Sequence, residues 1–174
     1  MAKLTAKQQQ WLIATHVIIG SLWFGTALSM VLISVLNRNT TDGTALYTLN
    51  TALKYLDDFV VIPTASLSLL TGAILCALTV WGFLKHYWVI AKWIATVTLI
   101  VTGTIWLGPW VNAMTAISEA ERSRAWENPL YVFDQKGALI GGAIQTVCIL
   151  GIIVISFVKP WGRRLPASKS DPES

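Results

Sequence analysis

Long apolar runs separated by short polar stretches are the dominant pattern along the chain. Four runs cover residues 11–36, 59–84, 88–111 and 138–158, and only the third contains a charged residue, Lys92. About 20 apolar residues are enough to cross roughly 30 Å of hydrocarbon as a helix. The pattern therefore predicts an all-α polytopic membrane protein, in which four transmembrane helices form a bundle with short loops.

The four runs also set the expected domain organisation. Residues 11–160 form one four-span membrane domain, preceded by an N-terminus of residues 1–10 and followed by a polar tail, 161–174, that we expect to be disordered. The first apolar run is longer than the roughly 7 to 15 residues of a signal-peptide core. We therefore expect it to remain in the protein as the first span.

The polar stretches predict how the spans are connected. Between the first two runs, four leucines follow a helical spacing, at Leu46, Leu49, Leu53 and Leu56. This period predicts an amphipathic helix lying flat on the membrane, with Asp57 and Asp58 at the N-terminus of the next span. Only residues 85–87 separate the second run from the third, which predicts a tight antiparallel hairpin.

The fourth run opens with small residues, including Gly137 and Gly141 at a spacing of four. Small residues at this spacing allow the backbone of another helix to approach closely. We expect this face to pack against a neighbouring helix, and a homodimer formed through it is one alternative.

Composition excludes several classes of function. Hydrophobic residues make up 54% of the chain and charged residues 13%, whereas a soluble domain contains about 25% charged residues. The sequence has no Walker loop, no metalloprotease His-Glu motif and no glycine-rich dinucleotide turn. Nucleotide hydrolysis is therefore not expected, and any ligand must be held between the helices.

The uneven distribution of charge predicts the orientation. The two ends, the second loop and Lys92 near the start of the third run together carry eight Lys and Arg residues against two acidic ones, and the other two loops carry five against seven. Because cytoplasmic loops carry the excess of Lys and Arg, both termini are predicted to be cytoplasmic. The net charge of +4 then needs no nucleic-acid partner; the expected partner is the lipid bilayer, and short loops favour a bacterial inner membrane.

The strongest candidates for a binding site lie near the predicted cytoplasmic face. His16 is an ionisable residue inside a span, and such residues usually face the interior of a bundle. Lys92 is expected at a depth in the membrane similar to that of His16, since the two residues lie four or five positions beyond the Trp that starts their run. Trp23 shares the helical face of His16, and His86 in the second loop is within reach. These four residues predict a pocket for a carboxylate or phosphate, against the alternatives of a hydrogen-bonded His16 and a Lys92 that extends to the headgroups.

Other polar residues give weaker predictions. Asp57, Asp58, Asn112 and Asp134 lie near span ends, where carboxylate oxygens can bind a cation. Their spacing is not typical of a metal site, so ordinary capping and solvation are favoured and no metal is predicted. Thr64, Ser68 and Thr71 share one helical face in the second span, which leaves a polar lining for a carrier as an alternative.

The combination of His16 with Trp23, Thr71 with Gly72, and Trp88 with Lys92 resembles the CopD and HemJ-type membrane proteins. The whole layout of residues 8–160, with its 81–93 and 107–110 segments, is more similar to uncharacterised bacterial four-span proteins grouped as a domain of unknown function. The HemJ-type resemblance implies haem b in the bundle and oxidation of protoporphyrinogen, with His16 and Lys92 as the two matching positions. The Arg and the further His residues of that family have no counterpart here.

Three interpretations of function follow. The leading one is an integral membrane protein of uncharacterised function with a pocket near the cytoplasmic face; this interpretation favours a protein that is not an enzyme. The second is a haem b-binding redox protein or a protoporphyrinogen oxidase-like enzyme. The third is a carrier for a small molecule or an ion. An absorption band of bound haem distinguishes the second from the other two.

Overall fold

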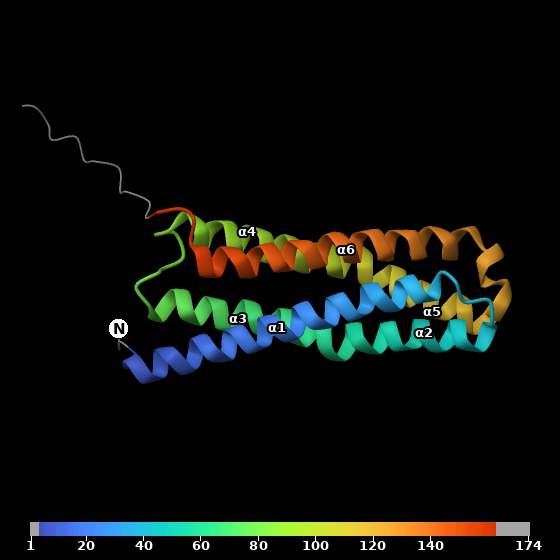
Figure 1. The fold of residues 1–174 in the computed structure, drawn as a ribbon, viewed down its shortest axis with the longest axis horizontal. Helices are drawn as coiled ribbons and strands as arrows, with labels where there is room; N and C mark the ends of the chain where they lie inside the picture. Colours follow the sequence, from blue (N-terminus) through green and yellow to red (C-terminus); the bar gives the residue numbers. More distant parts are fainter. Residues whose placement is uncertain (1–3, 163–174) are drawn as a thin grey trace, which may run out of the picture.

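A computed structural model describes residues 4–162 and shows a helical bundle, with both ends of the described chain at the same end (Figure 1). Thr5 caps the N-terminus of helix α1 (Ala6–Asn37): its hydroxyl accepts a hydrogen bond from the backbone N–H of Gln8, and the Gln8 side chain accepts one from the N–H of Thr5. This reciprocal cap satisfies two N–H groups that the first turn leaves free.

The other segments follow in order along the chain. They are α2 (Gly43–Leu56), η1 (Asp57–Val61), α3 (Ile62–Leu78), α4 (Tyr87–Thr102), η2 (Gly103–Leu107), α5 (Gly108–Glu121), η3 (Arg122–Glu127) and α6 (Pro129–Val158). The segments η1 and η2 are single π-helical turns, and η3 is a 3₁₀ helix. Because the helix continues through each π turn, these segments join into four long helical rods.

The prediction of an all-α bundle with four membrane-spanning helices is confirmed. The four rods, Ala6–Asn37, Gly43–Leu78, Tyr87–Glu127 and Pro129–Val158, are each long and apolar enough to cross a membrane. Large apolar side chains cover the outside of the bundle, as expected for a surface that faces lipid. The tail that we expected to be disordered lies, from residue 163 onward, outside the described residues.

The prediction of a surface-lying helix between the first two spans is wrong. Helix α2 continues through η1 into α3, so Asp57 and Asp58 lie in the middle of a rod and not at a helix N-terminus. Leu46 and Leu53 are fully buried in a core cluster with residues of α5 and α6. The apolar face of α2 is therefore covered by protein instead of lipid.

The predicted hairpin between the second and third spans is also wrong. Helix α3 ends at Leu78, and residues 79–86 form a longer turn in which Gly82 has a φ of +58°, a conformation that favours glycine. Helix α3 packs mainly on α1, α4 packs on α6, and α3 and α4 hardly touch (Figure 1). Helices α3 and α4 follow one another along the chain but do not pack against each other, which leaves room between their two rods.

The close approach predicted at the glycines of the fourth span occurs within the chain. A Cβ atom on Gly141 would lie 2.7 Å from the Leu107 Cδ2 atom, and one on Gly137 would lie 3.0 Å from the Trp110 ring. The π turn η2 and helix α5 therefore occupy this face of α6. A homodimer, which stays a prediction, would need another surface.

Buried polar side chains hold the end of the bundle opposite the termini. The Asn37 amide donates a hydrogen bond to the Asn50 side-chain carbonyl (2.6 Å), and the Asn50 amide donates one to the Tyr131 hydroxyl (3.1 Å). These three residues come from α1, α2 and α6 and are fully buried. Their hydrogen bonds fix the three rods against one another at this end.

Candidate functional site

The half of the bundle nearest the termini contains a cavity of about 440 Å³, which we call the inner cavity. His16, Trp23 and Gly20 line it from α1, Gly72 and Cys76 from α3, and Lys92 and Trp88 from α4. The turn after α3 contributes Trp81, and the end of α6 contributes Lys159. The volume lies within the range of roughly 300 to 1,000 Å³ that is typical of sites for small molecules and cofactors.

The hydrogen bonds around His16 indicate which tautomer its neutral ring adopts. His16 Nδ1 lies 2.8 Å from the Thr71 hydroxyl oxygen. The Thr71 hydroxyl uses its one hydrogen on the Leu67 carbonyl, at 2.7 Å, so it accepts the N–H of His16 Nδ1. In the neutral ring, Nε2 then carries the free lone pair.

The His16 ring packs against a glycine of α3, Gly72. A Cβ atom on Gly72 would lie 3.4 Å from the His16 Cε1 atom, a close contact, so the ring rests against the backbone of α3 at this position. Thr71 and Gly72 thus hold His16 from two sides, by a hydrogen bond and by packing. The arrangement resembles the outer-shell support that orients histidine ligands in metal sites.

Two lysines make the inner cavity cationic. Lys92 Nζ lies 6.0 Å from the centre of the Trp88 ring, and Lys159 Nζ lies 5.7 Å from the same ring and 5.3 Å from that of Trp81. Lys92 thus lines the cavity together with His16. Aromatic faces beside ammonium groups stabilise them by cation–π attraction, which favours these positions of the two lysines.

The other two candidate residues have different positions. Trp23 is 3% exposed and lines the inner cavity, and its indole N–H has no hydrogen-bond partner among the described residues. His86 does not line the cavity: its Nδ1 lies 2.9 Å from the Trp81 carbonyl, to which it donates a hydrogen bond that closes the turn after α3. The structure therefore brings His16, Lys92 and Trp23 together and leaves His86 outside.

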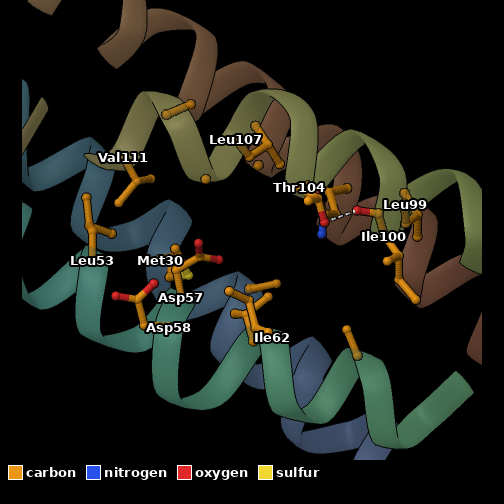
Figure 2. Close-up of a pocket in the computed structure, with 18 of the residues that line it drawn as sticks. Met30, Leu53, Asp57, Asp58, Ile62, Leu99, Ile100, Thr104, Leu107 and Val111 are labelled. Carbon is orange, nitrogen blue, oxygen red and sulfur yellow. Dashed lines mark hydrogen bonds between the residues drawn. The ribbon is translucent and has the colours of Figure 1, made fainter. Parts of the chain in front are cut away.

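A second cavity of about 400 Å³, which we call the outer cavity, lies between the rod that contains Asp57 and Asp58 and the rod that contains Thr104 and Leu107 (Figure 2). Asp57 and Asp58 line it from η1, Thr104 from η2, and Gln145 from α6. Trp23 lines both cavities and belongs to a buried apolar cluster with Ala27, Ala65, Leu99 and Ile149. This cluster separates a cationic cavity from one that carries two carboxylates.

The oxygen ligands considered at the span ends do not gather into a metal site. Within residues 4–162, no group of three or more His, Cys, Asp or Glu side chains is arranged to hold a metal ion. Asp134 is buried on α6 but is not among the residues that line the outer cavity. Asn112 and Asp58 both accept hydrogen bonds from Lys54.

Sequence reasoning missed Lys159 and the partnership of Thr71 with His16. Lys159 follows the last apolar run directly, and its position beside Trp81 and Trp88 depends on how α6 ends against the turn after α3. Counting residues inward from the start of a run, which pointed to Lys92, does not reach Lys159, because Lys159 lies outside the fourth run. Comparisons of the chain with family models, with curated proteins and with solved structures found no match.

Proposed function

We propose that this integral membrane protein binds an amphipathic ligand with carboxylate groups in its inner cavity, and that haem b is this ligand. The proposal depends on one observation above all: the Thr71 hydroxyl lies 2.8 Å from His16 Nδ1, in a cavity that His16 shares with Lys92. This contact engages Nδ1 and leaves Nε2 available to a ligand. A histidine nitrogen held in this way is the usual axial ligand of haem iron.

The lining of the inner cavity fits the two parts of such a ligand. Apolar and aromatic side chains, such as Trp88, Val89 and Ile152, suit a flat hydrophobic ring. The ammonium groups of Lys92 and Lys159 suit the two propionates, since charge-assisted hydrogen bonds to carboxylates are stronger than neutral ones. No other histidine lines the cavity among the described residues, so the proposal includes one protein ligand to the iron.

The proposal includes an orientation in the membrane. Lys85 and Lys92 lie at the end of the bundle that holds the termini, in agreement with the excess of Lys and Arg in cytoplasmic segments. The inner cavity would then open toward the cytoplasm. Bound haem would supply redox chemistry there, and the oxidation of a porphyrinogen that the resemblance implies stays a prediction.

Two glycines on α1 offer a matched test of the inner cavity. Gly20 lines the cavity and Gly25 does not, and a Cβ atom on either glycine would meet no other atom within 4 Å. Gly20→Leu therefore places a side chain in the cavity without a clash at Cβ, whereas Gly25→Leu places one on the exposed face of the same helix.

The test measures binding of added haem b to the protein in detergent by absorbance. We expect Gly20→Leu to lower the affinity at least tenfold, because the leucine occupies space that the ring needs, and Gly25→Leu to bind as the unchanged protein does. Equal affinities for the two variants would show that haem binds elsewhere and would refute the proposed site.

A carrier is the second candidate, because the inner and outer cavities end at the same side chain, Trp23. In an alternating-access transporter, movement of one part of the bundle against the other opens a central site to each side of the membrane in turn, and an apolar cluster between two cavities can act as the barrier in such a pathway. Vesicles that contain the protein and are loaded with protoporphyrin test it: a carrier releases the porphyrin to albumin outside faster than protein-free vesicles do, and a fixed binding site does not.

A further inference from the structure

We infer that the outer cavity is a second binding site, and that it takes a primary ammonium ion attached to an apolar body. The inference concerns Asp57, Gln145 and the two π turns, none of which takes part in the haem site. It is independent of the proposed haem site, since the charged groups and the amides that line the outer cavity do not line the inner one.

Asp57 supplies an unpaired negative charge. Lys54 forms an ion pair with Asp58 at 2.8 Å, and this is the only ion pair within residues 4–162. Asp57 therefore forms no ion pair of its own in the described part of the chain, although its carboxylate lines the cavity next to that of Asp58 (Figure 2). Gly108 leaves space for it, because a Cβ atom at that position would lie 3.5 Å from Asp57 Oδ2.

Gln145 supplies a second, independent acceptor. Its side chain is 8% exposed and lines the outer cavity, and its Oε1 atom is buried without a hydrogen-bond donor among the described residues. A buried polar atom without a partner costs about 1 to 3 kcal/mol, so such an atom beside a cavity points to a ligand that carries a donor. A carboxylate and an amide oxygen together require N–H donors and positive charge, which an ammonium ion provides.

The two π turns shape this cavity in the same way from two rods. In η1 the Ile62 N–H binds the Asp57 carbonyl, and in η2 the Gly108 N–H binds the Gly103 carbonyl; each bond spans five residues. A proline, Pro63 or Pro109, follows two residues after each turn. Since proline has no N–H, one carbonyl in each preceding turn lacks its usual donor.

Turns of this kind occur often at functional sites, and carbonyl groups of interrupted helices bind cations in transporters. Both turns line the outer cavity, with Asp57 in η1 and Thr104 in η2. Figure 2 shows the two segments on opposite sides of the cavity. The segment η1 belongs to the same rod as α3, and η2 to the same rod as α4; these two helices hardly touch. The size of the cavity and its apolar residues, among them Ile62, Leu99 and Leu107, then favour an organic cation over a bare metal ion.

The probe for this site is phenethylammonium, with phenethyl alcohol as the neutral molecule of the same shape. We expect calorimetry on the full chain in detergent to detect binding of the amine and none of the alcohol. Asp57→Asn should lower the affinity for the amine at least tenfold, because it removes the charge. The control, Glu127→Gln, removes an exposed carboxylate that does not line the cavity and should leave the affinity unchanged.

A second variant decides the matter if Asp57→Asn does not fold. Gln145→Glu keeps the shape of the side chain and adds a charge beside the cavity, so it should raise the affinity for the amine about tenfold. Equal binding of the amine and the alcohol would overturn the inference. So would an unchanged affinity in both variants, or binding of sodium ions without binding of the amine.

Discussion

Replacement of Gly141 by leucine should weaken the bundle by overpacking the contact between α6 and η2. The Cβ atom alone would lie 2.7 Å from Leu107 Cδ2, whereas carbon atoms in contact are normally about 3.5 to 4.0 Å apart. Leu107 would have to move by about 1 Å to restore this separation, and the rest of the new side chain needs further space. Overpacking of this kind costs about 1 to 3 kcal/mol.

The assay is thermal unfolding in detergent, followed by tryptophan fluorescence. A loss of about 3 kcal/mol, at the upper end because several atoms are added, corresponds to a Tm that is lower by about 6 to 12 °C for a chain of this size. Gly25→Leu is the control, since its side chain enters open space and the change in helix propensity is the same. If the two variants unfold at the same temperature, the close packing of α6 against η2 is refuted.

Three further predictions concern the inner cavity and the orientation. Thr71→Val should weaken haem binding about 10- to 100-fold, as loss of an outer-shell partner does in metal sites, because His16 Nδ1 loses its acceptor; equal affinity would remove Thr71 from this role. Lys92→Met should weaken the binding of haem but not of its dimethyl ester, and an equal loss for both would exclude a propionate contact. A phosphatase reporter fused after Thr41 should be active and one at the C-terminus silent, and the reverse result would invert the orientation.

Hydropathy predicted the number of spans because the tendency to enter lipid adds up along a run of residues, whatever the neighbours are. The continuity of α2 with α3 could not be predicted in this way, because Asp57 and Asp58 interrupt the apolar run. In the structure, Lys54 pairs with Asp58 one helical turn away, and this pair helps the helix to pass the two acidic residues. The π turn at the same place depends on packing against other rods, which the local sequence does not encode.

The sequence predicted which residues of the candidate site lie at the same depth in the membrane. Residue counting from Trp11 and Trp88 put His16 and Lys92 in one layer, and both residues do line the inner cavity. Counting could not show which rods are neighbours. The contact of His16 with Thr71 exists because α3 packs on α1 instead of α4, which reverses the prediction from the short loop.

The central claim is that His16 Nε2 holds a haem in the inner cavity, and a titration with haem b tests it most directly. The absorbance of haem added to the purified protein should show one saturable site in the unchanged chain. His16→Gly should abolish the band, and added imidazole should restore it, because a free imidazole can take the place of the missing ring. The claim is contradicted if no saturable band forms, or if His16→Gly binds haem as tightly as the unchanged chain does.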